Sequence, residues 1–176
     1  MNGLPLWKRF RILANPMRLE MLSLLNGRPP MFVQAIGEQL GCSEDVASKQ
    51  LQLLADGDFL SQERKGRFLF YSGMESDRLG CLVLEESLRD GADLGSIMKS
   101  LTAFTHERRI LIVRELAKGA RVFEELCGAT GISLDAMKRH LRKLEGRGFV
   151  ERRDGCWHGI ARKDRLGKDL LRIVLD

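Results

Sequence analysis

The feature that most constrains this chain is an internal repeat, in which the second half of the sequence follows the first at an offset that drifts from 91 to 87 residues. Arg18 recurs as Arg109, and the segment 77–80, Asp-Arg-Leu-Gly, recurs as residues 164–167. Six further pairs are identical at an offset of 90, namely Gly41 and Gly131, Ser43 and Ser133, Asp45 and Asp135, Leu51 and Leu141, Leu54 and Leu144, and Phe59 and Phe149. An ordered series of this kind predicts two copies of one fold.

We expect a first module at residues 1–90 and a second at residues 91–176, each built from four helices, a β-hairpin and a closing helix. Apolar residues recur at i, i+4 and i+7 in the opening helix of each copy, at Leu6, Phe10 and Leu13 and again at Ile97, Leu101 and Phe104. The pattern of caps and glycines then predicts helices at 16–26, 32–40, 43–57 and 78–89 in the first copy, and at 107–118, 122–130, 133–146 and 165–175 in the second. Ser43 and Ser133 are the expected N-caps of the fourth helices.

Two short runs around a glycine predict a hairpin in each copy. The first combines residues 59–63 and 67–71 around Lys65-Gly66, and the second combines residues 149–153 and 156–158 around Asp154-Gly155. An Asp-Gly pair is a strong signal for a two-residue hairpin turn. The fold class that we predict is therefore mainly α with small β-hairpin wings, as a tandem winged helix-turn-helix.

Composition excludes several classes of protein. The longest apolar runs, such as residues 110–113, are far shorter than the ~18 residues that a transmembrane helix needs. The N-terminus places Lys8 and Arg9 after a short apolar piece, the reverse of a secretory signal. The four cysteines form no Cys-x-x-Cys pair, which argues against a disulfide framework and a zinc knuckle. We therefore expect a cytoplasmic protein that makes no membrane contact.

The positive charge of the chain is confined to its second half. Residues 1–90 carry 11 Lys and Arg against 12 Asp and Glu, a net charge of −1, whereas residues 91–176 carry 18 against 12, a net charge of +6. The overall net charge of +5 is therefore a property of the second module. Excess positive charge on one module favours a polyanionic partner such as nucleic acid.

Three segments of the first copy resemble one known family. Residues 13–19 read Leu-Ala-Asn-Pro-Met-Arg-Leu, residues 36–41 read Ile-Gly-Glu-Gln-Leu-Gly, and residues 46–54 read Val-Ala-Ser-Lys-Gln-Leu-Gln-Leu-Leu. They resemble the ArsR family of bacterial winged-helix repressors over about residues 6–90. The second copy follows more loosely, with Lys-Arg-His-Leu-Arg-Lys-Leu at 138–144. The resemblance implies binding of double-stranded DNA on the bacterial nucleoid, usually as a dimer, and often a metal or small-molecule release signal, whose identity stays open.

The fourth helix of the second module is the main candidate for reading DNA. With Met137 at the centre of the buried face and a turn of about 100° per residue, Leu134, Leu141 and Leu144 point inward. The outward positions are Asp135 and four cations. Cations suit phosphates, arginine also suits guanine edges, and Ser133 at the helix start suits a phosphate. The candidate DNA-binding residues here are Ser133, Lys138, Arg139, Arg142, Lys143, Arg147, Arg152 and Arg153.

The first module offers a weaker surface for DNA. The outward face of its fourth helix has one cation, and Glu44 and Asp45 repel phosphates unless one of them accepts from a cytosine amine. Its candidate DNA-binding residues are Ser43, Ser48, Lys49, Gln52, Lys65 and Arg67. We expect the second module to supply most of the affinity and the first to contribute modestly or to form an interface.

Other classes of site find little support. Cys156 and His158, with His140 upstream, are the one group that resembles metal ligands, and two ligands on one strand do not make a zinc site. The sequence has no set of nucleophile, base and orienting residue and no phosphate loop, so we expect neither an enzyme nor a cofactor.

Two alternatives concern partners. Tandem winged helices similar to segregation and condensation protein B bind proteins in chromosome condensation, and the slightly acidic first half would suit such a role. For a DNA-binding role, two linked copies in one chain can form the pseudo-two-fold pair that ArsR-like repressors make as dimers, with recognition helices about 34 Å apart, or the chain can form a homodimer.

Overall fold

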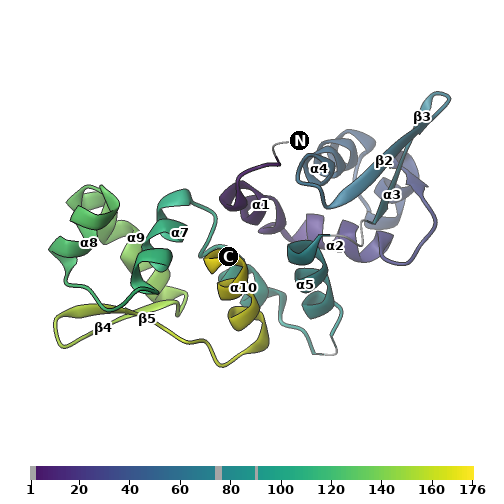
Figure 1. Ribbon diagram of the computed structural model, residues 1–176. Helices are drawn as coiled ribbons and strands as arrows, with labels where there is room; N and C mark the ends of the chain where they lie inside the picture. Colours follow the sequence, from purple (N-terminus) through teal and green to yellow (C-terminus); the bar gives the residue numbers. More distant parts are fainter. Residues whose placement is uncertain (1–2, 74–76, 90) are drawn as a thin grey trace. The chain divides into compact units, whose positions relative to one another are not determined.

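A computed structural model describes residues 3–73, 77–89 and 91–176, and its contacts divide the chain into two compact units, Met1–Met98 and Lys99–Asp176 (Figure 1). These units are the first and second modules of the structure. The boundary between them falls within the helix α6 (Leu94–Leu101). Residue 90, where the sequence predicts the end of the first module, lies outside the described residues.

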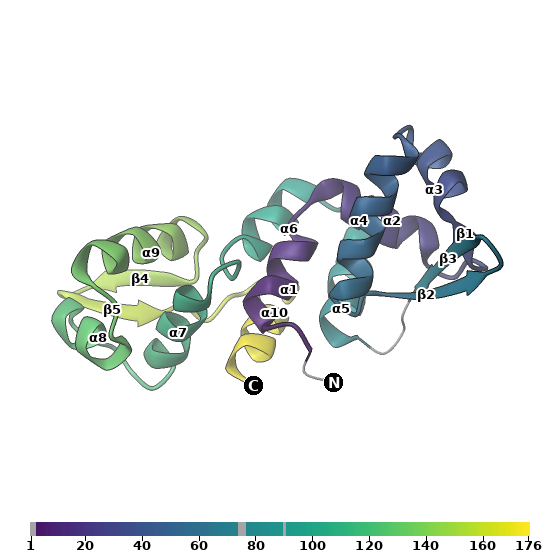
Figure 2. The same cartoon turned by 90° about the horizontal axis from the view of Figure 1, so that it is seen from above.

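The first module is a helical bundle with a three-stranded antiparallel sheet (Figures 1 and 2). The strand order is β1-β3-β2, so β3 pairs with both of the other strands. Its elements before α6 are α1 (Leu6–Leu13), α2 (Pro16–Leu25), β1 (Met31–Phe32), α3 (Val33–Leu40), α4 (Glu44–Asp56), β2 (Leu60–Lys65), β3 (Phe68–Gly73) and α5 (Arg78–Ser87).

The second module repeats this order, and Figure 2 shows its two-stranded sheet beside α8 and α9. A single bridge between Arg121 and Trp157 stands where β1 pairs with β3 in the first module. Both residues of the hairpin turn, Asp154 and Gly155, have positive φ, as the predicted Asp-Gly turn requires. Its elements after α6 are α7 (Glu107–Leu116), α8 (Phe123–Thr130), α9 (Leu134–Gly146), β4 (Val150–Arg153), β5 (Cys156–Gly159) and α10 (Arg165–Leu175).

The predicted fold class, mainly helical with two small hairpins in tandem, is confirmed, with local corrections. Phe32 belongs to β1 and not to the third helix, because its backbone pairs with Phe70. Phe104 is fully buried but lies beyond the end of α6. In the first hairpin Lys65 is part of β2, paired with Phe68, so the turn consists of Gly66 and Arg67.

The identical positions of the repeat are mostly core positions. Leu51, Leu54 and Phe59 in the first module, and Leu141, Leu144 and Phe149 in the second, are all at most 2% exposed. Burial of such side chains contributes about 1.5–3 kcal/mol each. The two copies are therefore most often identical at buried positions, where close packing tolerates few substitutions.

The repeated arginine has a structural role in both modules. Arg18 donates through Nε to the carbonyl of Ile12, and Arg109 donates through Nε to the carbonyl of Ala103 at 2.5 Å. In each case a second guanidinium nitrogen reaches the carbonyl one residue earlier. Carbonyls at the end of a helix lack partners within it, so the arginine satisfies them and joins the first helix to the second.

A second arginine in the first module connects four elements, and we call this group the first clamp: Arg9, Gly57, Phe59 and Asp77. Arg9 donates to the Gly57 carbonyl at 3.2 Å and pairs with the Asp77 carboxylate. Its guanidinium lies 5.0 Å from the centre of the Phe59 ring. Asp77 also accepts from the backbone of Gly80 as the N-cap of α5. The clamp thus joins α1, the end of α4, the start of the hairpin and α5.

The second module has an equivalent group, which we call the second clamp: Arg162, Arg147, Phe149 and Asp164. Here an arginine from a different part of the repeat makes the same contacts. Arg162 follows the hairpin and donates to the Arg147 carbonyl at 2.8 Å and to Asp164 at 2.6 Å. It lies 5.0 Å from the centre of the Phe149 ring, and Asp164 caps α10 by accepting from Gly167 at 2.7 Å. The position of Arg9 is held in the second module by Ser100, which is buried.

The clamps explain the recurring Asp-Arg-Leu-Gly segment. Its aspartate caps the last helix, and its leucine, Leu79 or Leu166, is buried. A Cβ atom on Gly80 would lie 2.8 Å from the Asp77 carboxylate and 2.9 Å from the Phe59 ring. A Cβ atom on Gly167 would lie 2.7 Å from Arg162 Nε. The glycine is therefore the residue that leaves room for the clamp.

We expect Arg162→Gln to lower the free energy of unfolding by about 1–2 kcal/mol, because it removes the ion pair, the carbonyl bond and the ring contact together. Chemical denaturation measures this change. Arg172→Gln is the matched control, since Arg172 pairs with Asp169 but its side chain is 68% exposed, and it should cost less than about 0.5 kcal/mol. Equal effects of the two substitutions would contradict a structural role for the clamp.

Candidate nucleic-acid interface

The helix α9 presents one apolar face to the core and one cationic face to solvent. Ala136, Met137, Leu141 and Leu144 are each at most 2% exposed. The four predicted outward cations, Lys138, Arg139, Arg142 and Lys143, are all exposed, as is Asp135. The prediction for Leu134 is wrong: it is 56% exposed, because it is the first residue of α9 and lies at the edge of the packed face.

The four cations of α9 are available for an external anion. Over the described ranges 3–73, 77–89 and 91–176, the structure gives none of the four an ion pair with a carboxylate. Burial lowers the pKa of Lys143, and the nearby charges of Arg147 and Arg109 lower it further. Lys143 therefore lies among other positive charges, whose mutual repulsion an anion can reduce.

The remaining candidates of the second module differ in their surroundings. Arg152 is exposed on β4, whereas Arg153 pairs with Glu151 at 3.0 Å on the surface. Arg147 is half-buried and donates through Nε to the Thr102 hydroxyl at 3.0 Å. Ser133 is the N-cap of α9 by backbone conformation, but its side chain makes no capping hydrogen bond, contrary to the expected cap. Its exposed hydroxyl is therefore not occupied by the helix.

In the first module the candidate residues are exposed but largely engaged with neighbours. Ser43 caps α4 by accepting from Val46 at 3.4 Å, and Gln52 donates to Asp56 at 2.7 Å. Lys65 pairs with Glu63 at 3.0 Å, and the Arg67 guanidinium lies 5.0 Å from the centre of the Phe68 ring. Ser48 and Lys49 are exposed on α4, on the same helix as the acidic Glu44 and Asp45.

Two of the three histidines of the second module, His106 and His140 of α9, lie with their rings in contact. His106 caps α7, accepting from Arg108 through Nδ1 at 3.2 Å, and its ring centre lies 4.5 Å from that of His140. The pKa of His140 is lowered to about 4. Burial is the largest cause, and the neighbouring groups His106, Arg109, Arg108 and Arg139 add to it. At neutral pH the His140 imidazole is therefore uncharged, and the charge of α9 comes from its lysines and arginines.

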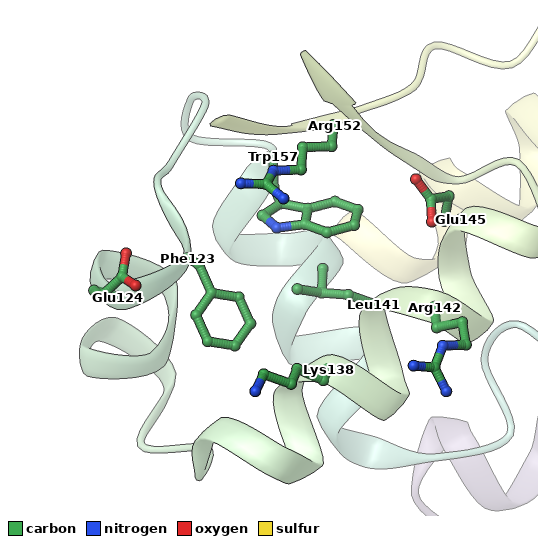
Figure 3. A pocket seen from close by; sticks show the side chains of 8 residues that line it. All are labelled: Phe123, Glu124, Lys138, Leu141, Arg142, Glu145, Arg152 and Trp157. Atoms are coloured by element: carbon green, nitrogen blue, oxygen red, sulfur yellow. The ribbon is translucent and has the colours of Figure 1, made fainter. Parts of the chain in front are cut away.

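A hollow between α8, α9 and the hairpin was missed by the sequence reasoning. Its volume is about 390 Å³, and Figure 3 shows aromatic and charged side chains around it. One signal pointed to it: Trp157 is one of two tryptophans and stands in a basic hairpin. The lining residues are Phe123, Glu124, Lys138, Leu141, Arg142, Glu145, Arg152 and Trp157.

The described residues also bear on metal binding and on membrane spanning. Among the described residues, no group of three His, Cys, Asp or Glu side chains lies close enough to hold a metal ion, and Cys156, His158 and His140 form no such group. Within the same residues, no helix is long and apolar enough to cross a membrane.

Comparison with known proteins assigns both modules. Residues 13–63 match a family model described as a helix-turn-helix domain, and residues 106–152 match the model of the arsR family of bacterial regulatory proteins. The chain is also similar to the transcriptional repressor SdpR of Bacillus subtilis, with 32% identity over 79 residues. This match covers 45% of the chain and 80% of the repressor.

Acidification should destabilise the second module through His140. Its pKa in the fold, about 4, lies below the ~6.5 of an unfolded chain, so the unfolded state binds more protons in this interval. Stability due to this group is complete above about pH 6.5 and is lost as the pH falls towards 4. We expect the Tm difference between the wild-type protein and His140→Gln to shrink or reverse between pH 7.5 and pH 5. A difference independent of pH would contradict the lowered pKa.

Proposed function

The chain belongs to the arsR family of bacterial regulatory proteins, and we propose how it acts as a DNA-binding transcriptional regulator: α9 enters the major groove of double-stranded DNA. The observation that carries this proposal is the face formed by Lys138, Arg139, Arg142 and Lys143. In a winged helix-turn-helix, this helix is the element that reaches base edges.

The repeat provides an internal comparison for this face. At an offset of 90 residues, the four cations of α9 correspond to Ser48, Lys49, Gln52 and Leu53 of α4. The two helices bury equivalent apolar positions in their own modules, so the fold alone does not require three additional cations on α9. Their presence on this one exposed face supports a partner with closely spaced negative charges, which is the property of duplex DNA.

Each residue of the second module has a proposed role. Arg139 and Arg142 contact guanine edges, since a guanidinium can donate twice to one guanine and so provides sequence specificity. Lys138 and Lys143 bind phosphates, and Ser133 donates to a phosphate at the start of α9. Arg147, Arg152 and Arg153 contact the backbone from the end of the helix and from the wing.

The first module contributes less to DNA affinity in this proposal. Lys49 and Gln52 face the groove, and Ser43 and Ser48 are placed for phosphate contacts. Lys65 and Arg67 on its hairpin touch the backbone. Glu44 and Asp45 repel phosphates at the start of α4, which limits the contribution of this helix.

A protein contact is the second candidate function of the first module. Val46 and Leu53 of α4 are 38% and 41% exposed, and Phe68 of the hairpin is 45% exposed. Apolar side chains beside acidic ones suit a protein surface better than a nucleic acid. Binding of a protein partner is also the role expected of a tandem winged-helix accessory protein similar to segregation and condensation protein B.

Fluorescence anisotropy with duplex DNA across a salt series tests the main proposal. We expect the affinity to fall with a log-log slope of about −4 to −6, since each neutralised phosphate contributes about −0.9. The double substitution Arg139→Glu with Lys143→Glu should weaken binding at least roughly 100-fold, because it replaces attraction by repulsion at one guanine-facing and one phosphate-facing position.

Lys49→Glu is the matched control, because Lys49 is the counterpart of Arg139 in the repeat. It should weaken binding about threefold or less. Absence of DNA binding at low salt would refute the proposal. A larger effect of Lys49→Glu than of the double substitution would assign the DNA contact to the first module instead.

The presence of two recognition helices in one chain leads us to infer that a single chain can do what two subunits do in a dimeric regulator. Sedimentation or light scattering should then give the mass of the monomer, 19.9 kDa, both free and per DNA site. Twice that mass would indicate a homodimer and contradict pairing within one chain.

A further inference from the structure

The hollow beside α9 combines an apolar floor with unpaired cations. Phe123 at the start of α8 and Trp157 of β5 lie next to Leu141, which is 1% exposed and forms the floor (Figure 3). Its volume, about 390 Å³, lies within the range of small-molecule sites, about 300–1,000 Å³. Such sites are mostly apolar with a few polar groups that orient the ligand.

The backbone of Trp157 is held in place by two hydrogen bonds to the backbone of Arg121. Trp157 donates to the Arg121 carbonyl at 2.7 Å, and Arg121 donates to the Trp157 carbonyl at 3.1 Å. On the other side of β5, Trp157 stands directly opposite Arg152 in the hairpin register. Figure 3 accordingly shows the Arg152 side chain at the indole. One wall of the hollow is therefore an aromatic ring with a guanidinium at its edge, both on a rigid hairpin.

The charges around the hollow favour a single negative charge on the ligand. Lys138, Arg142 and Arg152 have no ion pair among the described residues. The two carboxylates of the lining, Glu124 and Glu145, leave a net charge of +1. A monoanion satisfies this balance, whereas a ligand with several negative charges meets repulsion from the two glutamates.

The corresponding positions of the first module show that the fold does not demand this lining. Lys138 and Arg142 correspond to Ser48 and Gln52 at an offset of 90 residues. In the hairpins, the pair Arg152 and Trp157 corresponds to the opposed pair Gln62 and Tyr71. Tyr71 is only 1% exposed, whereas Trp157 is half-buried and borders the hollow. The cations and the accessible ring are particular to the second module.

We propose that this hollow binds a small planar aromatic carboxylate, with its ring between Phe123 and Trp157 and its carboxylate at one end of the hollow, on Lys138, and that this ligand releases DNA. The second part rests on the proposed function, in which Lys138, Arg142 and Arg152 bind the DNA. A carboxylate on Lys138 removes this lysine from the phosphates, and linkage makes the two ligands weaken each other by the same factor.

Isothermal titration calorimetry of the full chain with 2-naphthoate tests the site without DNA. The uncharged 2-naphthamide has nearly the same shape and should bind at least tenfold more weakly. Lys138→Gln and Phe123→Leu should each weaken naphthoate binding at least fivefold, with thermal melts to show that both variants fold. Lys168→Gln, an exposed lysine on α10, should leave binding unchanged. Equal binding of acid and amide, or no binding of either, would overturn the site.

Anisotropy with duplex DNA tests the coupling. At a naphthoate concentration ten times its Kd, the apparent Kd for DNA should rise about tenfold, and an unchanged Kd would overturn the release of DNA. Arg139→Gln should weaken DNA binding but leave naphthoate binding intact, because Arg139 does not line the hollow. If the chain binds naphthoate but never DNA, the ligand site stands and the proposed function fails.

Discussion

The arginine clamps are the interaction on which the geometry of each module depends. In both modules a guanidinium joins the carbonyl just after α4 or α9, the phenylalanine at the start of the hairpin and the aspartate that caps the last helix. Partly burying a charge costs free energy, and here several hydrogen bonds and an ion pair offset that cost. The clamps hold the end of α4 or α9 against the start of the hairpin that follows it, so they connect the two elements of the proposed interface.

The two modules share a core and differ at the surface, and this difference is what gives them different proposed tasks. Identical residues such as Leu51 and Leu141 are buried, because a close-packed interior restricts volume and shape. Exposed positions on the same helices carry no such restriction, so α9 holds four cations where α4 holds one. Four cations thus lie on one exposed face of α9, where they can act together on a single partner.

Much of the fold could be predicted from the sequence, because the repeat contains two versions of each element and the same prediction can be made from both. The helices, both hairpins and the exposure of the α9 cations follow from periodicity, caps and turn residues. The errors share a cause, which is that local pattern does not include distant contacts. Phe32 pairs with β3, and Leu134 has no neighbour to cover it at the edge of α9. The hollow at Trp157 was missed because its walls come from three elements.

The sequence by itself determined the number of modules, the class of fold and the side of α9 that carries charge, since these depend on spacing along the chain. Only the tertiary structure decided which arginine completes each clamp. Arg9 and Arg162 occupy unrelated positions in the repeat yet make the same contacts, because a long flexible side chain can reach one point in space from different backbones. Spacing along the chain does not predict that two arginines from unrelated positions make the same contacts, because these contacts form only when the helices pack.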